Sequence, residues 1–163
     1  MKQKDYLFTY KAISYVCFMT ILALFACRTN QTLSYSSIET TAIAAEMEGS
    51  YVIRVQGKGS TREMAYENAR RQAVHDVIFK SIHTSYGDHR MIHPLIKDPM
   101  VEQKEEAFFN GFFSDKGGYQ SFVEQTKENK IRNSNENTNS VILNVVVHRD
   151  KLKEFLLSRG FIH

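Results

Sequence analysis

The feature that most constrains this chain is its N-terminus, where a short positive segment leads into an apolar run. Three lysines outnumber the single acid, Asp5, and a mostly apolar stretch then continues to Ala26. That stretch is shorter than the roughly 20 residues that a membrane-spanning helix requires. A positive start followed by a short apolar run is typical of a secretory signal peptide. We therefore expect residues 1–26 to be removed and the folded protein to be built from residues 27–163.

The apolar run ends in Leu-Phe-Ala-Cys at 24–27, which resembles the lipobox of bacterial lipoproteins. In that family, a dedicated signal peptidase cuts before a cysteine whose sulfur has been joined to diacylglycerol. The resemblance implies that Cys27 is the acylated first residue of the mature protein. Leu24 and Ala26 fit the family pattern, whereas Phe25 is bulkier than the residue usual at its position. A soluble secreted protein and an uncleaved N-terminal anchor are the alternatives.

Lipid attachment also predicts a compartment. Two or more acyl chains hold a protein stably on a bilayer. Arg28 follows the cysteine, in place of the aspartate that retains lipoproteins at the inner membrane in well-studied enterobacteria. The resemblance therefore implies the outer membrane of a Gram-negative envelope, with the body on its periplasmic face. Because Cys17 lies in the removed segment, the mature chain would have no free thiol for a disulfide or a nucleophile.

The charge balance argues against a nucleic-acid partner. The whole chain has a formal charge of +3, but the removed leader holds three lysines and one aspartate of that balance. A nearly neutral mature chain has no basic stripe to neutralise phosphates. The partners that we expect are the membrane, through the lipid, and a protein of the envelope.

The mature sequence divides into a tether and one domain. Residues 27–49 are interpreted as the lipidated cysteine and a flexible tether, because Thr, Ser, Gln and Asn dominate and disfavour packing. Within the tether, Ile38–Met47 could form a short helix. Residues 50–163 have a length that suits a single α+β domain.

The first half of the domain predicts a strand followed by a helix. Ser50–Gln56 is rich in β-branched and aromatic residues, which favour a strand, and Gly57-Lys58-Gly59 is expected to end it. Ser60 and Glu63 form a capping box that begins a helix running to about Ile82. Small and apolar residues recur on one face of this helix and would let it lie close to a sheet: Ala65, Ala69, Ala73, Val74, Val77 and Ile78.

An irregular connection and a phenylalanine-rich helix come next in the chain. Residues 83–97 are expected to lack regular structure, and Asp98-Pro99 is a helix start signal. The helix should break or end near Asn110-Gly111, because glycine costs a helix about 1 kcal/mol relative to alanine. Its aromatic residues suggest core packing, with an exposed docking patch as the alternative: Phe108, Phe109, Phe112 and Phe113.

The C-terminal part predicts a hairpin and a last helix. Tyr119–Arg132 and Ser140–His148 are two strands around an asparagine-rich loop, Asn133–Asn139. Asp150 is the expected N-cap of the last helix, and Gly160 is its expected left-handed C-cap.

This order, β-α-α-β-β-α, predicts a two-layer α+β domain with helices on one face of a small mixed or antiparallel sheet. The body resembles a family of small bacterial envelope lipoproteins that includes the twenty-kilodalton Helicobacter lipoprotein and the N-terminal module of the flagellar assembly protein T. The resemblance implies a non-enzymatic interaction or assembly role, with no catalytic residue and no cofactor. The residues that carry it are Gly57-Lys58-Gly59, Ala65, Asn68-Ala69, Ala73-Val74, Val145-Val146-Val147 and Leu152.

Three histidines are the candidates for a metal site. His83, His89 and His93 fall close together, with Asp88 among them, and zinc takes three or four such ligands. Solvated loop histidines are the simpler interpretation. A metal there would favour the competing hypothesis, an envelope polymer hydrolase or metal-dependent enzyme that uses the loop His83–His93.

Three further patterns have structural alternatives. Gly57-Lys58-Gly59-Ser60 could receive an anion at a helix start, but a tight turn explains it as well. Glu102 and Glu106 could form a catalytic carboxylate pair, although solvated surface residues are expected at that spacing. The phenylalanines could hold a small hydrophobic ligand or a glycan, which gives a third hypothesis, a ligand-binding module.

Overall fold

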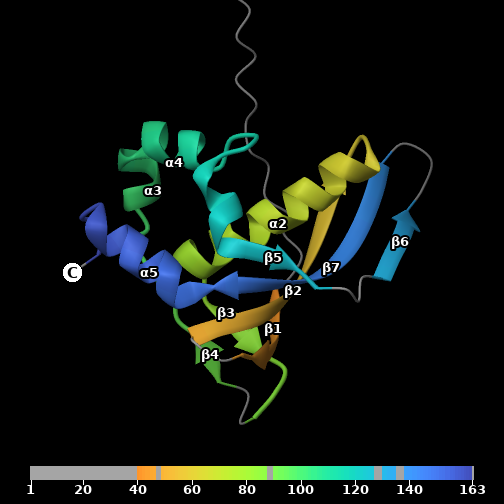
Figure 1. Cartoon of the computed structure of the whole chain (residues 1–163), viewed down its shortest axis with the longest axis horizontal. Helices are drawn as coiled ribbons and strands as arrows, with labels where there is room; N and C mark the ends of the chain where they lie inside the picture. Colours follow the sequence, from red (N-terminus) through yellow and green to blue (C-terminus); the bar gives the residue numbers. More distant parts are fainter. Residues whose placement is uncertain (1–39, 47–48, 88–89, 127–129, 135–137, 163) are drawn as a thin grey trace, which may run out of the picture. The chain divides into compact units, whose positions relative to one another are not determined.

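A seven-stranded mixed sheet forms one layer of the domain, in the order β4-β3-β1-β2-β7-β5, with β6 also paired to β7 (Figure 1). The computed structural model describes residues 40–46, 49–87, 90–126, 130–134 and 138–162, all within the unit Ser34–His163. The predicted α+β class is confirmed. The strands are β1 (Thr41–Ala45), β2 (Ser50–Gly59), β3 (Ile82–Thr84), β4 (Met91–Ile92), β5 (Val123–Gln125), β6 (Lys130–Ser134) and β7 (Thr138–His148).

The central pair is β2 and β7, which run antiparallel from Ser50 opposite His148 to Gly59 opposite Asn139. The alternation predicted for Ser140–His148 is confirmed. Its four odd-numbered residues, from Val141 to Val147, are almost wholly buried, and the even-numbered residues Ile142 to His148 are half-buried. One face of the sheet therefore belongs to the core.

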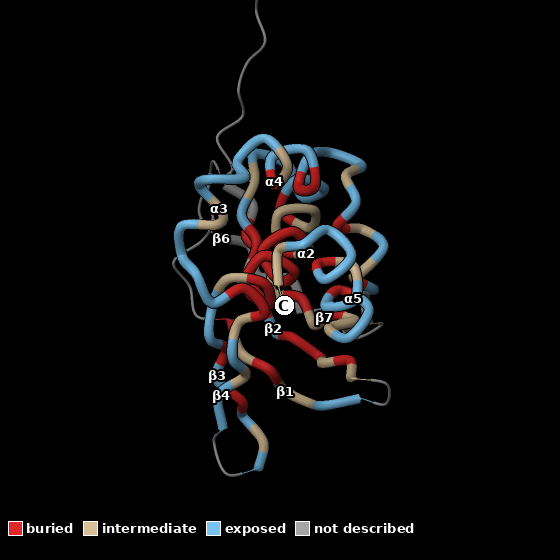
Figure 2. Tube along the Cα trace, turned by 90° about the vertical axis from the view of Figure 1, so that its left-hand side faces the viewer, coloured by how far each residue is buried: buried red, intermediate tan, exposed pale blue. Residues whose placement is uncertain are grey.

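Helix α2 (Arg62–Phe79) lies directly on this buried face, where Figure 2 shows the buried residues gathered. The predicted ridge is confirmed, because Ala65, Ala69 and Ala73 are 0 % exposed. The glycines do not end the strand as expected; β2 continues through both. A side chain on Gly57 would place its Cβ 2.0 Å from the backbone oxygen of Ala65, so the glycine allows helix and strand backbones to meet.

The ends of α2 differ from their sequence predictions. Its N-cap is Thr61, whose side chain accepts a hydrogen bond from the Met64 amide at 3.2 Å, and not Ser60. The shift arises from β2, which continues to Gly59. The helix ends at Phe79, before Ile82, because Ile82 pairs in the sheet as part of β3.

Strand β1 corrects the predicted tether. Thr41–Ala45 pairs antiparallel with β2 and parallel with β3, so neither a tether nor a short helix describes this segment. Ala42 is 0 % exposed, and burial between two strands outweighs the weak local preference of an alanine-rich run. Residues 27–39 of the predicted tether, including Cys27, lie outside the described residues, as do residues 24–26.

The connection 83–97 is also more regular than expected. Strands β3 and β4 pair antiparallel, and the segment after them returns to α2. The amides of Leu95 and Ile96 donate to the carbonyl oxygens of Val77 and Ile78, at 3.3 and 2.9 Å. These bonds satisfy carbonyls that the end of a helix otherwise leaves unpaired.

The phenylalanine-rich helix ends at Phe112, close to the predicted position, and it also has an earlier break that was not predicted. It consists of α3 (Val101–Lys104) and α4 (Glu106–Phe112), with the break at Glu105 and with Gly111 inside α4. Asp98 and Pro99 are not the N-cap and first residue of this helix, because the N-cap is Met100, without a side-chain cap. The Oδ1 of Asp98 accepts a hydrogen bond from the Met100 amide at 2.9 Å in the turn that precedes the helix.

The phenylalanines confirm the core interpretation. Phe109, Phe112 and Phe113 are 2 %, 6 % and 1 % exposed, while Phe108 is half-buried. Phe108 contacts Phe161, with ring centroids 4.7 Å apart, so the C-terminus closes over this aromatic cluster.

The predicted strand Tyr119–Arg132 is wrong in its first part. Gly118–Phe122 forms a 3₁₀ helix, η2, because Tyr119 is fully buried and its hydroxyl donates to Glu67 of α2 at 3.0 Å. The strand begins at Val123 as β5. The predicted hairpin is confirmed by the pairing of β6 with β7, but its loop is shorter than the predicted Asn133–Asn139, because Asn133 pairs with Asn139 and Ser134 with Thr138. Residues 135–137 between them lie outside the described residues.

The last helix is α5 (Arg149–Ser158), which follows β7 without a break. Asp150 lies in its first turn and is not the N-cap, because His148 takes that position with no side-chain cap. Gly160 is the predicted left-handed residue, with φ +77°. The amides of Gly160 and Phe161 donate to Leu157 and Leu156, each at 3.0 Å, which completes a Schellman motif.

The contact between α2 and β2 yields a stability prediction. Gly57→Ala should lower the free energy of unfolding by about 3 kcal/mol, because its Cβ must displace backbone atoms of α2. The matched control is Gly111→Ala in α4, where nothing lies within 4 Å of the added Cβ. That change should raise the free energy of unfolding by about 0.5–1 kcal/mol. Urea unfolding of both variants measures the difference; equal effects would show that α2 does not lie against Gly57.

Candidate functional site

An open cleft of about 480 Å³ lies at the β4 end of the sheet. The cleft draws its residues from both halves of the sequence: the β2 strand, the β3–β4 connection and the first residue of α5. It is lined by Tyr51, Thr84, Tyr86, Gly87, Arg90–His93 and Arg149.

The β3–β4 connection is pinned where it borders the cleft. The Thr84 amide donates to the Arg90 carbonyl at 3.0 Å, and the Thr84 hydroxyl donates to the same oxygen at 2.6 Å. The next residue extends the pairing with β1, because the Ser85 amide donates to the Ala42 carbonyl at 2.9 Å. Backbone bonds on both sides therefore hold this wall of the cleft in place.

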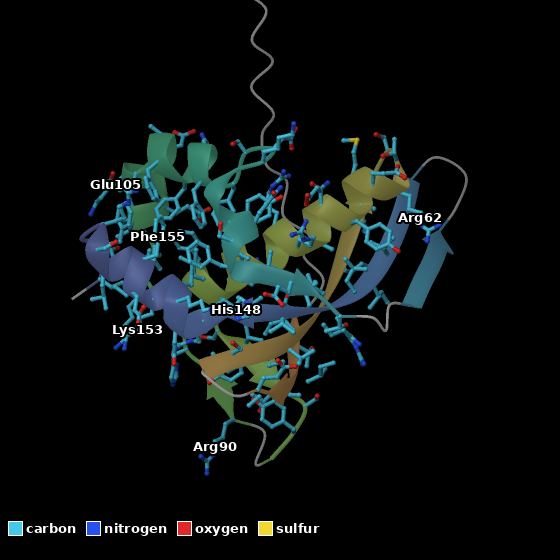
Figure 3. The ribbon with its side chains drawn as sticks, viewed as in Figure 1. Arg62, Arg90, Glu105, His148, Lys153 and Phe155 are labelled. Carbon is cyan, nitrogen blue, oxygen red and sulfur yellow. The ribbon has the colours of Figure 1, made fainter. Side chains whose placement is uncertain are left out.

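Arg149 forms the opposite wall. Its position results from the direct passage of β7 into α5, near the labelled His148 in Figure 3. One terminal nitrogen of its guanidinium donates to the His93 carbonyl at 3.2 Å. Its Nε is buried and has no hydrogen-bond partner among the described residues. The bond to His93 joins α5 to the segment that follows β4.

The described lining is cationic and aromatic. Arg90 and Arg149 supply two guanidinium groups, and no carboxylate occurs among the described lining residues. Burial, and then the nearby Tyr51 phenol, raises the pKa of Tyr86 above its ordinary value of 10.0. Tyr86 therefore stays protonated at neutral pH and can donate a hydrogen bond. The cleft offers positive charge, ring faces and hydroxyl donors.

Of the predicted histidines that the structure describes, one lines the cleft. His93 is part of the lining, whereas His83 is exposed and is not part of it. His89 and Asp88 lie outside the described residues. Within the described part of the chain, no three His, Cys, Asp or Glu residues are placed to hold a metal ion.

A second cluster is buried between α2 and α3. His75 lies between two carboxylates, with Nδ1 3.2 Å from Asp76 Oδ1 and Nε2 2.9 Å from Glu102 Oε1. Asp76 Oδ2 also accepts from the Thr40 hydroxyl at 2.5 Å, and Lys80 Nζ lies 3.0 Å from Asp76 Oδ1. The cluster links the residue before β1 to two helices.

The carboxylates determine the charge of this cluster. Burial by itself lowers the pKa of His75, but hydrogen bonds to Asp76 and Glu102 and their charges outweigh it, so the pKa lies above 6.5. Burial acts to raise the pKa of Asp76, yet its hydrogen bonds, first from His75, hold it below 3.8. The hydrogen bond from His75 likewise holds the pKa of Glu102 below 4.5. Both ring nitrogens are engaged, so His75 acts as a clamp and not as a free base.

Ser50, His148 and Glu124 form a third group on the face of the sheet opposite α2. His148 Nδ1 lies 3.0 Å from Ser50 Oγ, and its Nε2 lies 3.0 Å from Glu124 Oε1. The order serine, histidine, carboxylate occurs in hydrolase triads. Here Ser50 is only 5 % exposed and stands directly opposite His148 in the β2–β7 pairing. The group is a cross-strand polar ladder, which a second pair, Arg54 and Asn144, continues.

The sequence analysis predicted few of the residues that form the cleft and the two polar clusters. Glu102 was expected to be solvated, but it binds a buried histidine. The cleft residues Tyr51, Tyr86 and Arg149 give no local signal, because they come together only through strand order. His93 alone was a sequence candidate, and His75 could have been found as an ionisable residue on the apolar side of α2.

Comparisons with known proteins add no assignment: no family model, no curated protein and no solved structure matches the chain. No helix in the described part of the chain is both long enough and apolar enough to cross a membrane.

The His75 cluster predicts a pH dependence of stability. The folded pKa of His75 is raised, so its contribution is complete below 6.5 and is lost as the pH rises through the folded value. Asp76 and Glu102 have lowered values, so their contributions are present above 3.8 and 4.5 and are lost only in more acidic solution. The free energy of unfolding should therefore fall from about pH 6 to about pH 8.5.

Urea unfolding at the two pH values measures this decrease. His75→Gln should remove most of it, because the amide does not titrate. His93→Gln, at an exposed position outside the cluster, should keep it. A wild-type stability that rises over the same interval would contradict the clamp.

Proposed function

We propose that this protein is a non-enzymatic binding module of the bacterial envelope, anchored by lipid on Cys27, and that the cleft is its ligand site. The observation that carries the proposal is the cleft itself, whose walls are pinned by Thr84 and Arg149 and whose described lining offers cations and phenols. Such a preformed concave site with a few polar groups is what ligand-binding clefts share.

The arrangement of ionisable residues favours binding over catalysis. General acid and base catalysis needs a group with an available proton or lone pair beside the reacting atom. His75 has both nitrogens bonded to carboxylates, and Ser50 is buried within a sheet ladder. Of the described histidines of the loop His83–His93, only His93 lines the cleft, which gives less support to a hydrolase that uses this loop.

The third hypothesis, a ligand held by the phenylalanines, receives less support than the cleft. Phe109, Phe112 and Phe113 are packed against one another and against α2, with Phe109 stacked edge-on to Phe79 at 5.0 Å. Aromatic residues that already fill a core have little surface left for a ligand.

The membrane location in this proposal is supported by the sequence. The lipobox-like residues 24–27 support the lipid anchor, and Arg28 supports the outer membrane. The resemblance of the body to envelope lipoproteins supports an interaction or assembly role. An anchored module of this kind would hold its ligand close to the membrane surface.

Photo-crosslinking in intact membranes tests the ligand site. Benzoylphenylalanine placed at Tyr86, in the cleft, should yield an adduct, because the benzophenone inserts into nearby C–H bonds of proteins and saccharides alike. The matched control is the same substitution at Tyr66, a half-buried tyrosine on α2 beside Arg62. An adduct from Tyr66 of equal yield, or none from Tyr86, would contradict the cleft as the site.

The same experiment with Cys27→Ser tests the anchor. The variant should appear in the soluble fraction, because it lacks the sulfur that takes the lipid. Its adduct at Tyr86 should weaken or disappear as it leaves the membrane. A variant that remains membrane-bound would show that Cys27 is not the anchor.

A further inference from the structure

Residues 97–108 form a strap that is fixed at both ends and loosely held in between. Before the strap, the Ile96 amide donates to the Ile78 carbonyl at 2.9 Å, and after it Phe109 is only 2 % exposed. No residue of the strap is buried (Figure 2). The strap contains α3, which has no side-chain cap, and its backbone leaves the helical conformation at Glu105, labelled in Figure 3. Packing therefore contributes little to holding the middle of the strap in place.

One side chain of the strap reaches a buried partner on α2. Glu102 Oε1 lies 2.9 Å from Nε2 of His75; the histidine side chain is 4 % exposed and the glutamate side chain 41 %. The other ring nitrogen, Nδ1, lies 3.2 Å from Asp76 Oδ1. A protonated imidazole has two N–H donors, so it bonds both carboxylates at once. The strap is thus tied to α2 by a hydrogen bond that requires the doubly protonated ring.

Loss of one proton leaves the ring with one N–H and one lone pair, and a carboxylate that faces the lone pair is repelled. Asp76 cannot move away, because it is buried on α2 and is bonded there by further groups: the Thr40 hydroxyl, the Gln72 amide and Lys80 Nζ. Glu102 can turn to water, because its side chain is partly exposed. The neutral ring therefore keeps its N–H on Asp76 and presents its lone pair to Glu102.

The other groups around the ring do not replace the lost proton. The rings of Phe79 and Phe113 carry no charge, and their centroids lie 5.1 and 5.7 Å from that of the imidazole. Lys80 is the second cation of the cluster, and its Nζ lies 3.0 Å from the aspartate. With the ring protonated, two cations balance two carboxylates; without that proton, one negative charge is left uncompensated. The repulsion then acts on the carboxylate of the strap, which is the one free to move.

We propose that the strap 97–108 is a pH-operated latch, closed on α2 while His75 is doubly protonated and released from α2 when the ring loses a proton. Release uncovers Nε2 of a buried histidine and changes the surface of the protein along the whole strap. The latch does not depend on the cleft, so it goes beyond the proposed function.

The direction of the pH dependence follows from the environment of the ring. Burial lowers the pKa of His75, but the hydrogen bonds and charges of Asp76 and Glu102 outweigh it and raise the pKa above 6.5. The latch is therefore closed in mildly acidic solution and opens as the pH rises through the folded pKa. The hydrogen bond from His75 lowers the pKa of Glu102, so this carboxylate stays ionised as the ring loses its proton.

Amide hydrogen exchange of the full chain in detergent, followed by NMR, tests the latch. Lys104 and Glu105 report on the strap, because their amides donate to carbonyls one turn earlier, each at 2.9 Å. Between about pH 6 and about pH 8.5, their protection, corrected for the intrinsic effect of pH, should fall about tenfold, because a hydrogen bond to a charged group is lost. Arg159 and Gly160, whose amides are bonded at the exposed end of α5, are the matched control and should keep their protection.

Glu102→Gln gives the sharper result. The glutamine amide accepts from the protonated ring and donates to the lone pair of the neutral ring, so strap protection should change less than about twofold over the same interval. The pKa of His75, followed by its ring resonances, should fall relative to the wild type, because the charged acceptor is gone. Glu106→Gln removes the same charge next to the strap's hinge, where the partner is Asn110, and should keep the tenfold change. Since both side chains are at least partly exposed, both variants should fold.

Each contrary outcome overturns the latch. Strap protection that is constant or higher at the alkaline pH would show that the ring does not control the strap. An equal loss at Arg159 and Gly160 would show a general loosening of the fold. An unchanged pH dependence in Glu102→Gln would show that the strap is not tied through this residue, and unprotected strap amides at both pH values would show that it is not held at all.

Discussion

The structure depends first on the direct contact between the backbones of α2 and β2. Gly57 and Gly59 leave no side chain between strand and helix, and Ala65 and Ala69 supply the smallest side chains on the other side. A close-packed interior tolerates little change in volume. The spacing of the two layers is therefore set by these four positions, and the longer residues of β7 fill the space beside them.

The C-terminal half of α2 is hydrogen-bonded to the edge of the sheet that forms the cleft. Asp76 accepts from Thr40, the residue before β1, and Val77 and Ile78 accept from the segment after β4. Strands β1, β3 and β4 are short, so pairing alone would hold them weakly. Their attachment to a buried helix holds in place the strands β3 and β4, which supply part of the lining of the cleft.

The elements with a strong local pattern were predictable from sequence. Strand β7 alternates over its whole length, α2 carries its alanine ridge, and Gly160 ends α5 with φ +77°. The strands β1, β3 and β4 were missed because two to five residues hold no readable period. Their structure comes from neighbours far apart in the sequence. The cleft was missed for the same reason, since Tyr51 and Arg149 meet only when β2 pairs with β7.

Chemistry-bearing residues were easier to notice than to interpret. The three histidines of the loop stand out in the sequence, yet His83 and His93 do not share a site. His75 lies unremarked within a helix, and its two carboxylate partners come from its own neighbour and from a separate helix. An ionisable residue can be solvated, bonded on both sides within the fold, or available for a ligand. Which of these holds depends on how deeply it is buried, and a local sequence pattern does not indicate that.

The central claim is that a preformed cleft, held by the α2 contact, is the ligand site. The yield of the photo-crosslinked adduct from Tyr86 in intact membranes, measured in the background of Gly57→Ala, tests both parts of this claim most directly. The account predicts a clear loss of adduct, because the added Cβ disturbs the contact between α2 and β2, and no loss in the background of Gly111→Ala, where the added Cβ meets nothing. An undiminished adduct in the Gly57→Ala background, or no adduct from Tyr86 in any background, would contradict it.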